Sequence, residues 1–154
     1  MEPIKTEIVV LGAGPGGYTA AFYAADRGKK VTLVEQNPRL GGICLNSGCI
    51  PSKALLHATE ILREAKDSAA RGIELSEPKI DLDKLRAWKE SILERLGQGI
   101  KGLAQKRGVQ VIHGRGHFED SRTLRVETAE GQKFVSYEKA IIAVGSKPAM
   151  PSAF

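Results

Sequence analysis

The chain contains two cysteines, Cys44 and Cys49, which lie five positions apart just after a glycine-rich segment. Two thiols can form a disulfide by giving up two electrons and two protons. Gly48 gives the backbone between them the freedom to bend, so that their Cα atoms can approach disulfide range. The N-terminus has no secretory pattern, and a lone cysteine pair then favours a catalytic or metal-binding role over a structural one. A dithiol beside a nucleotide-binding segment indicates electron transfer between sulfur and a cofactor.

The residues after Cys49 favour a reactive thiolate at this position. Pro51 is tolerated only in the first turn of a helix, so we predict that a helix begins near Cys49. The dipole and the free amides of that helix end would stabilise a thiolate there. Lys53, four residues further on, lies on the same helical face as Cys49 and brings a positive charge toward a thiolate or a reduced cofactor.

Other interpretations of these residues stay open at this stage. A C-x₄-C spacing is not a zinc signature, and His57, His113 and His117 lie in different predicted elements, so we expect no metal site. We expect the three histidines to be structural or surface groups. The cysteines are alternatively inert core residues, and Lys53 is alternatively a solvated helix lysine.

Residues 12–17 read GAGPGG and fit the G-x-G-x-x-G pattern of dinucleotide-binding loops. In such a loop Gly12 permits the tight turn, and Gly14 lets the backbone approach a pyrophosphate. Gly17 lets the helix pack closely on the strand. The phosphates would bind the free N–H groups at the helix N-terminus. The pattern does not distinguish FAD from NAD, and a glycine-rich turn without a ligand is the alternative.

Glu35 ends the strand that follows the glycine-rich loop. An acidic residue at this place is predicted to accept a hydrogen bond from a ribose hydroxyl and to disfavour a ribose that carries a 2′-phosphate.

These residues are carried by a predicted α/β arrangement that begins with a β-α-β unit. Strands with nearly continuous apolar runs are typical of a buried parallel sheet, and the helical segments have apolar residues along one stripe. The predicted strands of this type are 4–11, 31–35 and 140–144, and the helices are 18–27, 49–70 and 82–107, with a loop at 36–48. Short segments punctuated by turns predict a small antiparallel meander of 109–113, 116–119, 123–128 and 133–137.

The composition is that of an ordinary globular domain. The chain has 154 residues, is 42% hydrophobic and 27% charged, and has a net charge of +5. Its basic residues are scattered, and only eight aromatic residues are present (three Tyr, four Phe and one Trp), so nucleic-acid binding is not expected. No apolar run approaches the ~20 residues of a membrane helix. We expect no membrane partner and a cytoplasmic location.

Four segments, GAGPGG, VTLVE, GGICLNSGCIPSK and AIIAVGSKPAMP, resemble the pyridine nucleotide-disulfide oxidoreductases, a family of flavoenzymes. The segments KALLHATEILREAK, EPKIDLDKLRAWKESILERL and HGRGHF are similar to the family's bacterial members that reoxidise lipoyl groups of 2-oxo acid dehydrogenase complexes. The resemblance covers essentially the whole chain. It leaves open a related reductase of glutathione disulfide or mercuric ion, a non-catalytic FAD-binding module, and a fragment that only docks on partner domains.

The resemblance implies a Rossmann-like FAD-binding domain with tightly bound FAD. It implies that Glu35 contacts the adenosine ribose, that residues 35–44 line the nucleotide, that Lys53 lies near the reactive flavin nitrogen, and that the Gly116 backbone contacts the adenine. With the three glycines of the loop, the cofactor-binding residues are then expected to be Glu35, Gly42, Cys44, Lys53, Gly116 and Gly145.

The resemblance also separates the roles of the two sulfurs. Cys44 corresponds to the interchange thiol that reacts with substrate, and Cys49 to the charge-transfer thiol against the flavin ring, with Lys53 as the third catalytic residue. Two departures from the family pattern remove a hydroxyl near the cofactor, namely Ile43 in place of a common threonine and Val144 in place of the threonine of an Ala-Thr-Gly sequence. We expect backbone groups to replace these hydroxyls.

The resemblance finally implies that residues 1–154 are an N-terminal FAD-binding segment with a redox-active disulfide. The NAD-binding domain and the C-terminal interface domain are expected to be absent from this chain. In the family, the catalytic His-Glu base comes from the C-terminal interface domain of the partner subunit. The segment alone is therefore expected to be inactive. In the longer protein the expected partners are NAD, lipoyl domains and the second subunit of a homodimer.

Overall fold

The computed structural model describes residues 2–147 and 149. The chain forms two compact units, one of Met1–Gly42 with Ile100–Phe154 and one of Ile43–Gly99. The first unit contains the sheet, and the second is helical. Pro148 and residues 150–151, the end of the AIIAVGSKPAMP segment, lie outside the described residues.

The first unit is built on one mixed sheet of six strands in the order β3-β2-β1-β6-β5-β4. Strands β3, β2, β1 and β6 run parallel to their neighbours, whereas β6, β5 and β4 pair antiparallel. This confirms the predicted α/β class with a parallel part and an antiparallel meander. The strands are β1 (Ile4–Leu11), β2 (Val31–Glu35), β3 (Gln110–His113), β4 (Arg115–Phe118), β5 (Thr123–Thr128) and β6 (Gly131–Ile142).

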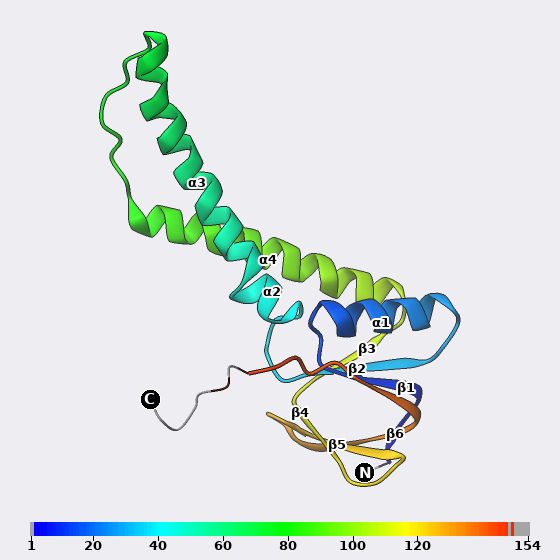
Figure 1. Cartoon of the computed structure of the whole chain (residues 1–154). Coiled ribbons are helices and arrows are strands. Elements are labelled where there is room, and N and C mark those ends of the chain that lie inside the picture. Colours follow the sequence, from blue (N-terminus) through cyan, green and yellow to red (C-terminus); the bar gives the residue numbers. More distant parts are fainter. Residues whose placement is uncertain (1, 148, 150–154) are drawn as a thin grey trace. The chain divides into compact units, whose positions relative to one another are not determined.

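The sheet is covered on both faces, as its apolar strands require. All five residues of β2 are buried. Because side chains alternate along a strand, Val9 and Val10 of β1 enter two different core clusters. The cluster around Val10 includes α1 residues and the end of α4, and the cluster around Val9 includes residues of β5 and β6. In Figure 1, α1 lies on one side of β1 and β2, and β4 and β5 lie on the other side of these strands.

Helix α1 (Pro15–Asp26) packs closely because its buried residues are small, namely Gly17, Ala21 and Ala24. It begins three residues before the predicted start at Tyr18. Pro15 occupies the first helical turn, where its missing N–H group costs nothing.

Two strand predictions are wrong. Residues 109–113 were predicted to belong to the antiparallel meander, but β3 pairs parallel with β2. Residues 133–137 and 140–144 were predicted as separate strands, but β6 is continuous. The charged pair Glu138–Lys139 resembles a turn in the sequence, yet it occupies exposed positions of β6 opposite β1.

The second unit contains α3 (Cys49–Asp67), a 3₁₀ turn (Ser68–Arg71) and most of α4 (Leu82–Lys106). Both long helices were predicted with nearly these bounds. The predicted loop 36–48 is wrong in part, because it contains the short helix α2 (Gly42–Asn46). The Asp81 carboxylate accepts hydrogen bonds from the Asp83 and Lys84 amides and so caps the start of α4.

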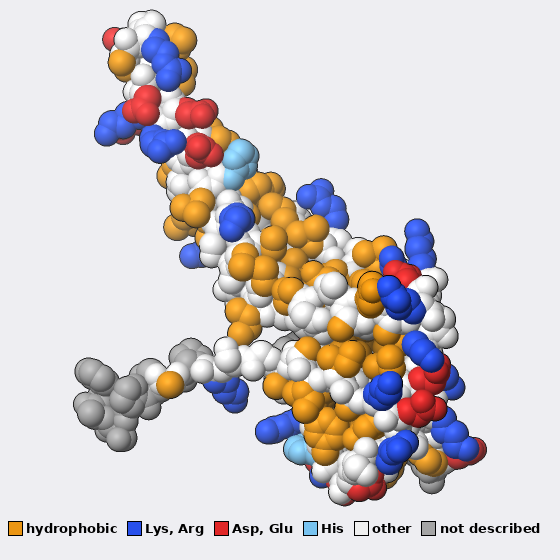
Figure 2. Space-filling view, turned by 45° about the vertical axis from the view of Figure 1, so that its right-hand side comes forward, with side chains coloured by type: hydrophobic (Ala, Val, Ile, Leu, Met, Phe, Trp, Pro, Cys, Tyr) orange, Lys and Arg blue, Asp and Glu red, His pale blue; other side chains and the backbone are white. Residues whose placement is uncertain are grey.

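The helices of the second unit expose many large hydrophobic side chains, which Figure 2 shows in orange. No helix in the described part of the chain is long and apolar enough to cross a membrane. The exposed residues on α3 and α4 of this unit include Leu55, Leu56, Ile61, Leu82, Trp88 and Leu96.

Candidate functional site

The turn between β1 and α1 is so tight that two of its glycines cannot carry a side chain. Gly12 has a φ of +97°, and a Cβ built on it would overlap the Ala143 carbonyl, coming within 2.8 Å of its carbon. A Cβ on Gly17 would overlap the Gly12 carbonyl oxygen. The Gly12 amide donates to the Val34 carbonyl at 2.8 Å, which ties the turn to β2. These contacts give the geometric reason for the first and last glycines of the predicted loop.

The N-terminus of α1 presents unused hydrogen-bond donors. Its N-cap residue, Gly14, has no side chain to cap the helix. Within the described residues the amides of Gly14, Gly16 and Gly17 have no hydrogen-bond acceptor, and a Cβ on Gly16 would meet open space. Uncapped amides at the positive end of a helix dipole form a site that accepts phosphate. The residues present therefore fit the pyrophosphate of a dinucleotide.

A second glycine pair closes on this loop within the first unit. The Gly41 amide donates to the Ala13 carbonyl at 2.8 Å. Gly42 has a φ of +61°, and a Cβ on it would lie 2.6 Å from the Gly14 Cα. The predicted cofactor residue Gly42 therefore lies directly against the glycine-rich loop.

Glu35 is buried at the end of β2, with 5% of its surface exposed. One carboxylate oxygen, Oε2, accepts the Ala13 amide at 2.7 Å. The other, Oε1, accepts the Asn37 backbone amide at 2.9 Å and the Asn37 side-chain amide at 2.8 Å. The structure thus places Glu35 against the loop, and its predicted contact with a ribose hydroxyl stays a prediction. It adds Asn37, for which the sequence pattern carries no signal.

The two remaining predicted cofactor glycines of the first unit have different structural reasons. A Cβ on Gly116 would lie 2.6 Å from the Leu11 Cδ1 and 3.2 Å from the Leu124 Cδ2, so close packing explains a glycine in β4. Gly145 has a φ of +73° and open space around it, so its backbone conformation explains it. Contact of either residue with a cofactor stays a prediction.

The two cysteines of the second unit lie on consecutive helices. Cys44 is in α2 and half-buried, whereas Cys49 is the first residue of α3 and exposed, and both are free thiols. Gly48 between them packs tightly, since a Cβ there would lie 3.0 Å from the Ile43 carbonyl oxygen. The predicted start of a helix at Cys49 is confirmed.

The two sulfurs interact. The pKa of Cys44 is raised above its usual value, first by a hydrogen bond to the Cys49 sulfur, then by burial and by the charge of a Cys49 thiolate. The Cys49 backbone amide and the Lys53 ammonium oppose this rise. In the reduced pair the raised pKa favours the protonated form of Cys44, and Lys53 lies close enough to act on the Cys44 charge.

Cys49→Ala is expected to lower the pKa of Cys44 toward its usual value, because the substitution removes the largest cause of the rise. At a pH near or below the pKa of Cys44, a larger fraction of Cys44 is then thiolate, and alkylation of Cys44 becomes faster. Lys53→Gln is the matched control of opposite sign, since loss of the ammonium raises the same pKa. The measurement is the pH profile of iodoacetamide alkylation at Cys44, followed by peptide mass. An unchanged profile in Cys49→Ala would contradict the contact.

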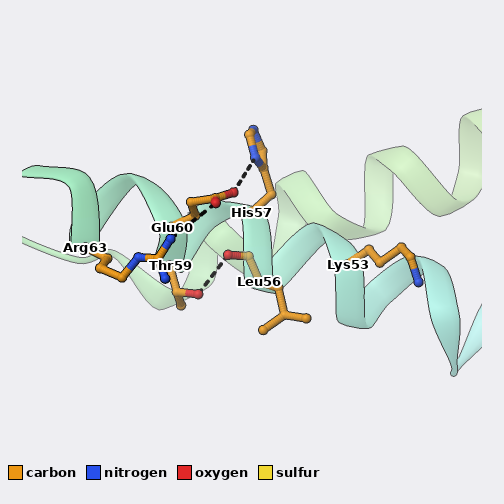
Figure 3. A pocket seen from close by; sticks show the side chains of 6 residues that line it. All are labelled: Lys53, Leu56, His57, Thr59, Glu60 and Arg63. Carbon is orange, nitrogen blue, oxygen red and sulfur yellow. Dashed lines mark hydrogen bonds and ion pairs between the residues drawn. The ribbon is translucent and has the colours of Figure 1, made fainter.

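Lys53 is one of the residues that line a shallow hollow of about 370 Å³ on one face of α3, shown in Figure 3. Glu60 in this hollow pairs with His57 at 3.9 Å and with Arg63 at 3.5 Å. Lys53 makes no ion pair with the described residues, so its charge is available for another partner. The hollow is lined by Lys53, Leu56, His57, Thr59, Glu60 and Arg63.

The other two histidines also have local partners. The His113 Nδ1 lies 2.9 Å from the Asn37 carbonyl oxygen, and the His117 Nε2 lies 3.6 Å from a Glu127 carboxylate oxygen. Among the described residues no group of three or more His, Cys, Asp or Glu side chains is arranged to hold a metal ion.

Comparison with known proteins gives one family over nearly the whole chain. Residues 6–153 match the model of the pyridine nucleotide-disulphide oxidoreductases. A dihydrolipoyl dehydrogenase of Haemophilus influenzae is 50% identical over 148 residues, and one of Vibrio cholerae is 48% identical over 147. Each alignment covers 96% of this chain and 31% of the relative.

A solved structure supports the same fold. It is the Cu(II) complex of a cysteine-to-serine mutant of RclA, an HOCl-induced flavoprotein disulfide reductase from Escherichia coli. Its TM-score to this chain is 0.76 at 28% sequence identity, over 97% of this chain and 30% of that one. The chain thus spans about a third of the length of the proteins it matches.

Proposed function

Because the chain belongs to the pyridine nucleotide-disulphide oxidoreductase family, we propose that it is the part of a dihydrolipoyl dehydrogenase that holds FAD and the redox-active disulfide. The observation that carries this proposal is the placement of two free thiols on consecutive helices, Cys44 in α2 and Cys49 at the start of α3. Relatives of 40–50% identity that are named dihydrolipoyl dehydrogenase support the choice of activity within the family.

The first unit would hold the adenine dinucleotide. The free amides of Gly14, Gly16 and Gly17 would donate to the pyrophosphate, and Glu35 would accept a ribose hydroxyl. Bound FAD would supply a two-electron acceptor that receives the electron pair of the dithiol and delivers it as hydride to NAD⁺. We propose that NAD⁺ is bound by a segment corresponding to the part of the relatives that this chain does not match. The same part would provide the general base that acts on the substrate.

The second unit would perform the thiol–disulfide exchange. A dihydrolipoyl thiolate attacks the Cys44 sulfur of the oxidised pair, and the Cys44–Cys49 bond breaks as Cys49 leaves with the electron pair. The second substrate thiolate then attacks the substrate sulfur of the mixed disulfide and releases Cys44. The lipoyl group is oxidised and the dithiol reduced by two electrons. Cys44 leaves the mixed disulfide as a thiolate, and its raised pKa favours the uptake of a proton.

We propose two partners for the longer protein. The first is a lipoyl domain that presents the substrate dithiol. The second is another subunit of a homodimer, for which the exposed apolar side chains of the helical unit offer contact area. Leu56, with 66% of its surface exposed, is one such side chain.

Reconstitution of the 154-residue chain with FAD tests whether this segment holds the cofactor. We expect FAD to remain with the protein on gel filtration and to keep visible flavin absorption. Addition of dithiothreitol should then produce a long-wavelength shoulder from the Cys49 thiolate against the flavin. A chain that is folded by circular dichroism but releases FAD would contradict the proposal.

A further inference from the structure

The acceptor positions of the Glu35 carboxylate are almost all occupied. A carboxylate has two oxygens and about four acceptor positions. Asn37 fills both positions of Oε1 with its backbone and side-chain N–H groups, and the Ala13 amide fills one position of Oε2. One acceptor position therefore remains, and it is on Oε2, the oxygen that already binds the glycine-rich loop.

Asn37 is itself held in place. Its carbonyl oxygen lies 2.9 Å from the His113 Nδ1 on β3. The strand end beneath it is fixed as well, because the Gly114 amide donates to the Glu35 carbonyl at 2.8 Å and Glu35 pairs with His113 in the sheet. The segment after β2 is thus anchored to β3 through the Asn37 carbonyl, which holds the Asn37 backbone beside Glu35.

We propose that Asn37 is a positioning residue for the nucleotide. By occupying Oε1 completely, it fixes the plane of the Glu35 carboxylate and reserves the remaining position on Oε2, beside the Ala13 amide, for one ribose hydroxyl. The inference rests on the proposed function, because it assumes that the ligand is an adenine nucleotide. Without the Asn37 side chain, only the backbone amide of residue 37 would bind Oε1, and the carboxylate shared by the loop and the ribose would be free to turn.

The test compares Asn37→Ala with Gln36→Ala in the full 154-residue chain. Gln36 is the neighbouring exposed amide and makes no side-chain hydrogen bond with the described residues, which makes it a matched control. Calorimetry measures binding of ADP and of 2′,3′-dideoxy-ADP, so that the ratio of the two affinities reports the contribution of the two ribose hydroxyls, one of which is proposed to bind Oε2. We expect a preference for ADP of about tenfold in the unmodified chain and in Gln36→Ala, the usual effect of one hydrogen bond to a charged group. In Asn37→Ala the preference should fall to about twofold.

A second measurement needs no ligand. Hydrogen exchange of the Ala13 amide should be about tenfold faster in Asn37→Ala than in the unmodified chain, because its acceptor, the Glu35 carboxylate, loses the side-chain bond of Asn37 and keeps only the backbone bond. Both variants keep the backbone N–H of residue 37, and Asn37→Ser adds a side-chain hydroxyl donor, so it should restore part of the protection.

The outcomes separate the inference from the function on which it rests. If Asn37→Ala weakens both nucleotides equally, Asn37 only stabilises the loop and the inference is overturned. If the unmodified chain binds neither nucleotide, nucleotide binding by this chain fails, and Ala13 exchange then decides the role of Asn37. Unchanged exchange in Asn37→Ala overturns that role, and faster exchange supports it.

Discussion

Gly17→Ala is expected to destabilise the sheet-containing unit by more than about 3 kcal/mol, and hence to abolish nucleotide binding. The new Cβ would overlap the Gly12 carbonyl oxygen and lie 2.8 Å from its carbon, so the clash is with backbone and no side chain can yield. Gly12 is also fixed, because it donates to Val34 and lies against Ala143. Helix α1 would have to move away from the turn that precedes it.

Gly16→Ala is the matched control for this prediction. It is the adjacent glycine in the same helical turn, and a Cβ there meets nothing within 4 Å. Its effect on the free energy of unfolding should be within about 1 kcal/mol and stabilising in sign, because alanine favours a helix over glycine. Urea denaturation followed by circular dichroism measures both variants. Equal stability of Gly17→Ala and the unmodified chain would show that the turn is wider than described.

Cys49→Ser is expected to lower dihydrolipoamide oxidation by more than about a thousandfold. Without the second sulfur no disulfide forms, and a serine hydroxyl cannot leave as Cys49 does. The assay requires the domains that the relatives possess, so this chain would replace the matching 148 residues of the Haemophilus influenzae relative. The measurement is NADH formation from NAD⁺ and dihydrolipoamide, normalised to bound FAD.

Cys44→Ser is the companion variant that separates the two thiols. It should abolish turnover as completely, because no disulfide forms. It should nevertheless keep long-wavelength absorption, which depends on Cys49, whereas Cys49→Ser should lose it. If Cys49→Ser kept that absorption, the roles assigned to the two sulfurs would be reversed.

The parts of the fold that depend on local chemistry could be predicted from the sequence. The β-α-β unit around Gly12–Gly17 follows from apolar strands, a tight turn and a helix that begins at a proline. The long helices α3 and α4 also follow from local patterns. In contrast, the pairing of β3 with β2 joins Glu35 to His113, and a pairing across so many residues has no local pattern that would indicate it.

The site shows the same division. The loop glycines and the start of a helix at Cys49 could be derived from residue type and spacing. Asn37 could not, because its importance depends on the rotamer of Glu35 and on a strand that is distant in the sequence. The packing of Gly116 against Leu11 is likewise a property of the folded sheet.

The most direct test of the central claim is dihydrolipoamide-dependent NADH formation by the unmodified hybrid enzyme. If this chain holds FAD and the redox-active disulfide of a dihydrolipoyl dehydrogenase, the hybrid should retain one FAD per chain and turn over within about tenfold of the parent relative. A hybrid that folds and retains FAD but forms no NADH, or that reduces glutathione disulfide in preference, would contradict the claim.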